Sequence, residues 1–432
     1  MADLRGQQLK DSYQDVVTRG AGNKLENGNG VEFADLDDKA SLLSSKISVS
    51  VGSGGDFPTI NDALRDLTKR MQTYITGQGV IAEINLLSGF VMAEQVIVEG
   101  DDFSWIEITS EDAQVTIDRS AITEEVEAVG NTNRKAVFCA RGSGHLPIIG
   151  CLFYMDNSGD SNVDFCFCVD GGRAHIRPDC GCDNAGAHAF YALSGSYQYL
   201  RGAIATNSGL YAVRGAHASW QQARSVNGDG AKSRGFLTGA ASVQDNRGST
   251  CNDCEGDWAY RSSNGGFQCN DITSANNCAG IAYVCEEGAI QQNANSTANN
   301  CSDAAFDCRN AGVQNNMNTE AKNCGGNYAY RITNSGSQNN RDADCSNSSN
   351  GATYADNAAT QNNRDMVAND MGAGIIVFVG SSSVVNARGF IQNGGEFSVT
   401  RGSSMYVSGP SENQLSQSPN TITSDGIIFF ET

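Results

Sequence analysis

Acidic side chains that could act in pairs gather in one part of the chain, namely Asp257, Glu286, Glu287 and Asp307. Two carboxyl groups about 5 to 9.5 Å apart can cleave a glycosidic bond, one as acid and one as nucleophile or base. These four are therefore candidate catalytic residues of a glycan-degrading hydrolase or lyase. The simpler interpretation is structural, because Glu286 and Arg309 occupy equivalent positions in consecutive repeats and could form a surface ion pair.

Two tryptophans could contact a saccharide. Trp220 and Trp258 lie near polar residues, and an aromatic ring on a polar face can stack on a pyranose ring. They are candidate glycan-binding residues. The alternative is that each ring fills a wide part of the core.

Cysteines are the third group with possible chemistry, and the chain has 15 of them. One cluster could bind a metal, namely Cys166, Cys168, His175, Cys180 and Cys182. A zinc site usually needs two cysteine pairs with two to four residues between partners, and this spacing differs. Positions i and i+2 would place both thiols of a pair on one strand face, so packing as small apolar side chains is favoured. We expect reduced cysteines, no metal and no cofactor.

An internal repeat explains how these residues would be positioned. One column of the repeat is aromatic: Tyr191, Tyr211, Phe236, Tyr260, Tyr283, Phe306, Tyr330, Tyr354 and Phe378. A second column is glutamine, with asparagine two residues later in every case: Gln244, Gln268, Gln291, Gln314, Gln338 and Gln361. A third is cysteine: Cys254, Cys278, Cys301 and Cys324. A fixed spacing of 23–24 residues indicates a solenoid.

The residue types indicate a β-solenoid. Helical repeats are longer and would not tolerate so much Gly, Asn and Ser, and neither leucine-rich nor propeller signatures fit. About three short strands per turn would bond to the next turn at a rise of about 4.8 Å. Equivalent residues would then stack, so that Tyr260, Tyr283, Phe306, Tyr330 and Tyr354 share one face. Buried amides of Gln268, Gln291, Gln314 and Gln338 would bond along the axis. The predicted class is an all-β parallel β-helix.

The ends of the chain differ from the repeats. Thr59 and Asp62 resemble a helix capping pair before a helical pattern that runs to Ile75, and this helix would close the open first turn. The predicted divisions are an attachment segment at residues 1–50, the cap helix and first turns at 51–145, the regular shaft at 146–374, and a separate C-terminal β segment at 375–432. That last segment ends in an apolar run, Ile427 to Phe430, which is predicted to be a cap or a seam between subunits.

Charge limits the possible partners. The formal net charge is −20, which disfavours nucleic acid. We expect no membrane insertion, because no apolar run is long enough to span a bilayer. The N-terminus lacks the apolar core of a secretory signal, so a protein acting outside the cell would leave by lysis or as part of an assembly.

Two motifs resemble known families. The sequence GSGGDFPTINDAL at residues 52–64 resembles the entry to pectin-lyase-like right-handed β-helices, which include pectin methylesterases. The esterase motifs are not intact, so that activity is not expected. GQQLKDSY at residues 6–13 and NGNGV at residues 27–31 resemble the virion-attachment segments of bacteriophage tail fibres and tailspikes. The resemblance implies a right-handed β-helix and a homotrimer in the virion, assembled in the host cytoplasm. Residues 1–50 would bind tail or baseplate proteins, and the shaft would contact host surface polysaccharide or another receptor.

Two functions follow from these observations. The first is a structural, receptor-binding tail fibre or tailspike without enzymatic activity. The alternative is a polysaccharide depolymerase on the same scaffold. The regular repeats favour the first, because active sites usually interrupt regularity with long loops.

Overall fold

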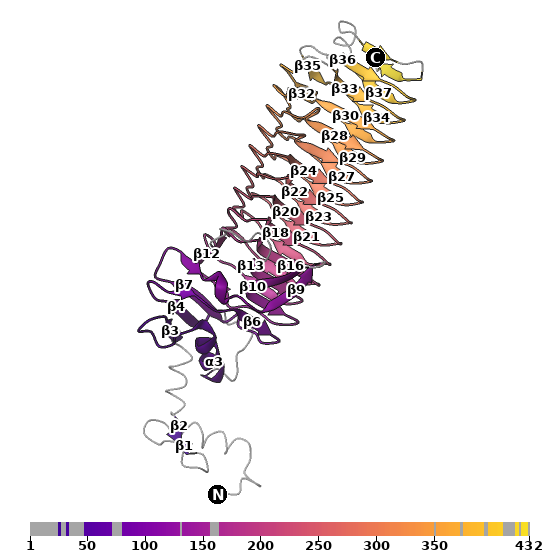
Figure 1. The fold of residues 1–432 in the computed structure, drawn as a ribbon. Coiled ribbons are helices and arrows are strands. Elements are labelled where there is room, and N and C mark those ends of the chain that lie inside the picture. Colours follow the sequence, from indigo (N-terminus) through magenta and orange to yellow (C-terminus); the bar gives the residue numbers. More distant parts are fainter. Residues whose placement is uncertain are drawn as a thin grey trace, which may run out of the picture.

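The turns of the chain stack into an elongated shaft, with the only α-helix among the described residues at the N-terminal end (Figure 1). The computed structural model describes residues 25–26, 32–33, 47–70, 80–129, 132–155, 164–349, 351–371, 375–392, 396–408, 420–422 and 425–430. These residues form a parallel β-solenoid of about 13 turns. The predicted fold class is confirmed.

The first long sheet, sheet I, has 15 strands, and all neighbouring pairs are parallel except β9 with β10. Its strands are β6 (Val96–Glu99), β9 (Glu125–Val129), β10 (Thr132–Arg141), β13 (Asp164–Asp170), β16 (His188–Leu193), β18 (Tyr211–Gly215), β20 (Arg234–Thr238), β22 (Trp258–Ser262), β24 (Ile281–Cys285), β26 (Phe306–Cys308), β28 (Tyr330–Thr333), β30 (Thr353–Asp356), β33 (Ile375–Val379), β36 (Glu396–Val399) and β38 (Asn420–Ile422).

The second long sheet, sheet II, has 12 parallel strands and forms another face. Its strands are β14 (Arg173–His175), β17 (Tyr197–Tyr199), β19 (Trp220–Gln222), β21 (Val243–Asp245), β23 (Phe267–Cys269), β25 (Ile290–Gln292), β27 (Val313–Asn315), β29 (Ser337–Asn339), β31 (Thr360–Asn362), β34 (Val384–Asn386), β37 (Ser404–Val407) and β39 (Ile427–Phe430).

The third face has regular strands only near the two ends of the shaft. Between them one residue per turn, from Ile204 to Asp344, forms an isolated parallel bridge. The strands of this face are β5 (Val91–Met92), β8 (Val115–Ile117), β12 (Leu152–Met155), β15 (Gly181–Asp183), β32 (Val367–Ala368) and β35 (Ile391–Gln392). An N-terminal sheet contains β3 (Ile47–Val51), β4 (Ala82–Leu86), β7 (Ile106–Ser110) and β11 (Ile148–Ile149), and β1 (Leu25–Glu26) pairs with β2 (Glu32–Phe33).

The corners of each turn use left-handed backbone, which explains the abundance of Asn, Asp and Gly. The corner between sheets I and II contains two such residues in succession, as at Asn310 and Ala311. Single left-handed residues recur at the other two corners, as at Asn318 and Asn323. Asparagine and glycine adopt this conformation at low cost, whereas a β-branched residue such as Ile272 (φ 62°) does not.

Two ladders of buried amides run through the core of the shaft. The glutamine ladder begins at Gln198 and ends at Gln361, and each side-chain N–H donates to the glutamine one turn earlier (2.7–2.8 Å). The asparagine ladder from Asn246 to Asn363 donates in the opposite direction, to the next turn (2.8–2.9 Å). Within each turn the asparagine also donates to the glutamine (2.9–3.1 Å). These bonds compensate the cost of burying the amides.

Aromatic rings stack beside the ladders. Phe236, Tyr260, Tyr283, Phe306 and Tyr330 have successive ring centroids 4.7–5.0 Å apart and nearly parallel planes. The residue before each inward ring also points inward, so it must be small. At Gly235, for example, an added Cβ would lie 2.2 Å from the Cys251 sulfur.

Four residues assigned to the aromatic column lie outside this stack, and those assignments are wrong. The last of them, Phe378, pairs with Tyr354 and stacks on its ring, with centroids 4.8 Å apart. Thr353 pairs with Tyr330, and Tyr354 pairs instead with Arg331 on the outer face. Tyr191 pairs with the outward Arg214, and Tyr211 pairs with His188. An earlier inward stack of Phe138, Phe167 and Phe190 was not predicted.

The two ends of the shaft match the predictions from the sequence in part. α3 (Ile60–Arg70) begins at the predicted capping pair, since the Asp62 N–H donates to the Thr59 hydroxyl (3.1 Å) and Glu94 accepts from the Ile60 N–H (2.6 Å). The predicted continuation of the helix to Ile75 lies outside the described residues. Strands of the C-terminal β segment continue sheets I and II through β39. Among the described residues, no helix is long and apolar enough to cross a membrane.

Candidate functional site

The clearest hollow lies beside the corner between sheets I and II in the first turns. Glycines form this corner, with Gly171 (φ 74°) and Gly195 (φ 75°) in left-handed conformation. Gly172 is required by close packing, because an added Cβ would lie 2.5 Å from the Gly144 carbonyl oxygen. The absence of side chains leaves open space next to the backbone.

One column of outward residues borders this corner. Parallel pairing joins Asp102 to His145 and His145 to Arg173. The column continues through β14, β17 and β19, which pair Arg173 with Tyr197 and Tyr197 with Trp220. Each successive turn thus contributes one side chain that can recognise a ligand.

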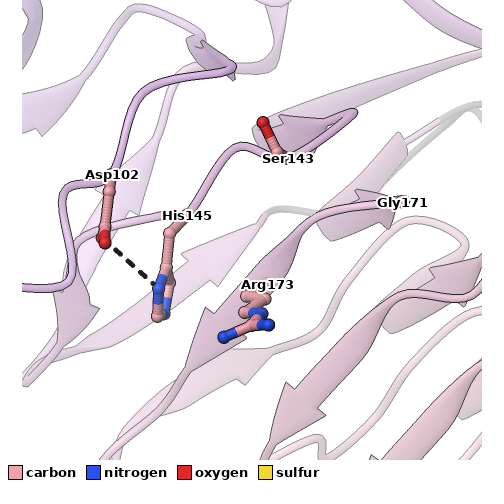
Figure 2. A pocket seen from close by; sticks show the side chains of 5 residues that line it. All are labelled: Asp102, Ser143, His145, Gly171 and Arg173. Atoms are coloured by element: carbon pink, nitrogen blue, oxygen red, sulfur yellow. Dashed lines mark ion pairs between the residues drawn. The ribbon is translucent and has the colours of Figure 1, made fainter. Parts of the chain in front are cut away.

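Two adjoining hollows follow this column. The first, of about 190 Å³, is lined by Asp102, Ser143, His145, Gly171 and Arg173 (Figure 2). The second, of about 430 Å³, is lined by Gly171, Gly172, Arg173, Gly195, Tyr197 and Trp220. Because they share Gly171 and Arg173, we call them together the Arg173 cleft.

The charges at the narrow end of the cleft are set by burial and by the neighbouring side chains. Burial lowers the pKa of His145, a shift that Asp102 opposes and Arg173 reinforces. Burial alone would raise the pKa of Asp102, but hydrogen bonds from Ser104 together with the charges of His145 and Arg173 lower it. At neutral pH the cleft therefore contains an aspartate, a neutral imidazole and the Arg173 cation. His145 Nδ1 lies 3.5 Å from an Asp102 oxygen, and the Ser143 hydroxyl points away from the imidazole (Figure 2).

The predicted catalytic residues lie elsewhere, on the outer face of sheet I. Glu286 and Asp307 are buried carboxylates, 3% and 1% exposed. Arg309 lies 2.6 Å from Glu286 and 3.7 Å from Asp307, so the expected Glu286–Arg309 ion pair is present. Arg261 also binds Glu286, and Arg331 binds both oxygens of Asp307 (2.9 and 3.1 Å). These carboxylates form a chain of ion pairs covered by arginines and not an open pair.

The other two candidate carboxylates, Asp257 and Glu287, are more exposed than Glu286 and Asp307, and neither belongs to this chain of ion pairs. Asp257 is largely exposed and is bound by Arg234 through two nitrogens (2.9 and 3.2 Å). Glu287 is an exposed left-handed corner residue with φ 57°. This network does not resemble the acid and base pair of a glycosidase.

The two predicted glycan-binding tryptophans have different environments. Trp220 is 48% exposed and lies at the cleft, with its ring 4.9 Å from that of Tyr197. Trp258 is only 5% exposed, and the guanidinium groups of Arg234 and Arg261 lie 5.3 Å from its ring centre. Trp258 therefore cannot offer its ring to a saccharide in this structure.

The cysteine cluster does not form a metal site among the residues that the structure describes. No group of three or more His, Cys, Asp or Glu side chains there is arranged to hold a metal. The expectation that Cys166 and Cys168 share one strand face is wrong, because Cys166 lies in the main core and Cys168 in a separate outer cluster. The Cys254, Cys278, Cys301 and Cys324 thiols are free and buried.

The sequence contained a signal for part of the cleft. Tyr197 and Trp220 each directly precede a glutamine of the ladder, Gln198 and Gln221. Following the glutamine column two turns earlier would have placed both rings in one outward column. Nothing in the repeat indicates Asp102 or His145, because they lie in turns whose length and residue pattern differ.

Comparison of the sequence with known protein families and curated proteins identified no relative. No protein-family model matches the chain, and no curated protein is similar to it in sequence.

Proposed function

We propose that this chain is the shaft of a bacteriophage tail fibre or tailspike, in which three copies associate side by side and contact a host surface glycan. Residues 1–50 would attach the fibre to tail or baseplate proteins, and the assembly would form in the host cytoplasm and act on the virion. The observation that carries the proposal is the outer face of sheet II from β21 to β39, beyond the Arg173 cleft.

That face is apolar and almost uncharged. Of the 12 large hydrophobic side chains exposed in the described parts of the chain, eight belong to sheet II. Trp220 lines the Arg173 cleft, and Phe430 lies in the last turn beside the buried Val407. The other six are on the outer face beyond the cleft: Val243, Ile290, Val313, Val384, Ile427 and Phe429. Between them lie mainly Gln, Asn, Ser and Thr. Among the described strands from β19 to β39, Asp245 is the only charged outward residue, and it is bound by Arg224 and Arg247.

A second copy of the chain is the partner that fits this face. Copies with a net charge of −20 repel one another, so contact is favoured where charge is absent. Burying apolar area contributes about 25 cal/mol per Å², and the face extends along the shaft. Turning three such faces toward a common axis would bury them all and suit a rotationally symmetric tail.

Native mass spectrometry of the full-length chain and its variants tests this association. We expect a trimer for the natural chain and for Val91→Lys, which adds a charge at an exposed site outside sheet II. We expect Ile290→Lys with Val313→Lys, and Phe429→Ser with Phe430→Ser, to yield monomers. A monomeric natural chain at micromolar concentration would refute the proposal.

Attachment is tested by truncation. β3 pairs with β4 from Ile47 onward, so the deletion should stop at residue 45 to preserve the N-terminal sheet. We expect a soluble, folded trimer that no longer joins the particle. Particles that still incorporate it would show that attachment lies elsewhere.

The depolymerase alternative receives no support from the predicted acidic cluster. Glu286 and Asp307 are engaged by arginines, and Asp257 is bound by Arg234. Receptor contact without cleavage is the function that these contacts favour.

A further inference from the structure

The Arg173 cleft combines an aromatic surface with a cation that forms no direct ion pair among the described residues. Its residues come from consecutive turns, so they follow the axis of the shaft as the rings of an extended chain would. The two hollows together are large enough for more than one small group.

Tyr197 and Trp220 supply the aromatic surface. Their ring centroids are 4.9 Å apart with an interplanar angle of 48°, and Trp220 is 48% exposed. The Tyr197 hydroxyl donates to the Gln222 side-chain oxygen (3.3 Å), which holds that ring in place. Such rings bind the apolar C–H face of a sugar.

Arg173 supplies the charge. It is exposed and makes no side-chain hydrogen bond or ion pair with any residue that the structure describes. Further along the shaft the situation differs, since Arg224, Arg234, Arg261, Arg309 and Arg331 each bind a carboxylate. A guanidinium left unpaired beside a hollow is suited to bind a carboxylate or sulfate through two N–H groups.

Asp102 and His145 set the orientation at the narrow end. The aspartate repels a second anion but can accept hydrogen bonds from sugar hydroxyls. The neutral imidazole adds no charge, so Arg173 is the group in the cleft that attracts an anion.

We propose that the Arg173 cleft binds an acidic saccharide, with the anionic group on Arg173 and a neighbouring pyranose ring on Tyr197 and Trp220. This inference rests on the proposed role in glycan contact and specifies the class of glycan. It also places receptor contact on the flank of the shaft near its N-terminal end.

Tryptophan fluorescence reports on this site directly. The chain has three tryptophans, and Trp105 and Trp258 are only 3% and 5% exposed. Quenching by iodide or acrylamide therefore acts mainly on Trp220. The full-length protein is titrated with a hyaluronan tetrasaccharide, its carboxyl-reduced neutral form, a sialylated trisaccharide and a sulfated disaccharide. The carboxyl-reduced form keeps the shape of the tetrasaccharide without its charge. The sialylated and sulfated probes carry anionic groups other than a uronate.

We expect at least one anionic probe to protect Trp220 from quenching, and the neutral form to bind about tenfold more weakly. Arg173→Gln should weaken anionic binding by about tenfold or more, and Arg173→Lys by less, because it retains the charge. Trp220→Ala should weaken binding several-fold, measured by calorimetry. Arg201→Gln removes the same charge from an exposed corner outside the cleft and should have no effect.

Two results would overturn the inference, and both are distinct from failure of the fibre proposal. Equal binding of neutral and anionic probes, unchanged by Arg173→Gln, would leave glycan contact intact and exclude the acidic class. No binding by any probe to a correctly assembled trimer would exclude the cleft as a saccharide site while the fibre proposal stood. Circular dichroism of each variant verifies that the solenoid is retained.

Discussion

The turns before β17 and the shaft after it follow similar backbone paths but stabilise their cores differently. The early turns pack aliphatic and aromatic side chains such as Ile84, Ile108, Phe138 and Phe153, and their third face contains regular strands. The turns after β17 replace much of this packing with amide ladders, and from Ile204 to Asp344 their third face is reduced to single bridges.

The difference shows how stability and binding are divided along one molecule. Apolar packing is not directional, so the early turns accommodate glycine corners and the hollows beside them. A hydrogen-bonded ladder requires the same position in every turn, and it produces a uniform face suited to contact with another copy. The cleft and the association face therefore lie in adjacent regions of one column, with Trp220 as the last residue of the cleft and Val243 as the first of the association face.

The largest expected effect on the difference between the two regions comes from removing one amide from the glutamine ladder of the shaft. Gln291→Leu would leave one N–H of Gln314 and one of Asn293 without an acceptor. Gln268 would lose one of its two donors. At about 1–3 kcal/mol for each of the two unpaired N–H groups, the free energy of unfolding should fall by about 2–6 kcal/mol in urea titration. Gln292→Leu, at the half-buried neighbouring position, should cost less than about 1 kcal/mol. Similar losses in both variants would show that the ladder is not essential.

Lowering the pH should destabilise the early turns more than the rest of the shaft. Burial lowers the pKa of His145, and it lowers the pKa of His175 to about 4. The unfolded chain then binds more protons, so their contribution to stability is complete above about pH 6.5 and is lost as the pH falls toward 4. Because both rings retain solvent contact, we expect a loss of about 1 kcal/mol.

Hydrogen exchange at pH 7 and pH 5, corrected for intrinsic rates, measures this difference. Amides of β14 and β17 should lose protection, whereas those from β23 to β31 should not, because the sequence contains no histidine after His217. His175→Phe should reduce the loss. Uniform loss of protection along the shaft would contradict this division.

At one corner of the shaft the residue type differs from that at the equivalent corners of the next turns, and a single substitution restores it. Ile272 has φ 62° and is 68% exposed, whereas Asn295 and Asn318 occupy the same corner in the next turns. Ile272→Asn should raise the free energy of unfolding by about 1 kcal/mol, because it relieves left-handed strain in a β-branched residue. Ile290→Asn, in an extended strand, provides the control and should not stabilise the fold. A destabilised Ile272→Asn variant would indicate that this side chain makes a contact in the assembly.

The smallest effect concerns the break in the aromatic stack. Thr353 is buried, and its hydroxyl has no partner among the described residues. Thr353→Val keeps the shape and removes the unpaired group, so we expect a gain of about 1 kcal/mol in thermal or urea unfolding. Thr360→Val, on the exposed side of β31, should have little effect.

The sequence predicted the solenoid and its columns because every turn repeats the same inward positions. It did not predict the register at Tyr354, where a shift of one residue moves the side chain to the opposite face of the strand. Cys166 and Cys168 were misplaced for a related reason. Cys166 and Phe167 both point inward, as Val137 and Phe138 do in the paired strand, so the alternation is interrupted while the register between the two strands is kept.

The candidate site was less predictable than the fold. Trp258 lies on sheet I, where Arg234 of the preceding turn and Arg261 of its own strand cover its ring, whereas Trp220 lies on sheet II. The column from Asp102 to Trp220 crosses turns of unequal length, so no fixed spacing connects its first members. Its chemistry depends on a guanidinium without a partner, and an absent contact leaves no pattern in a sequence.

The opposed directions of the two amide ladders have a consequence for the length of the fibre. Glutamine amides point toward one end and asparagine amides toward the other, so their dipoles largely cancel and no field accumulates as turns are added. Each turn also presents the same donors and acceptors above and below. Duplicating or deleting one whole repeat would therefore preserve every bond and change the reach by about 4.8 Å, whereas inserting a single residue would not. The length of the shaft can therefore change in evolution by whole repeats, which unequal recombination between repeats would add or remove.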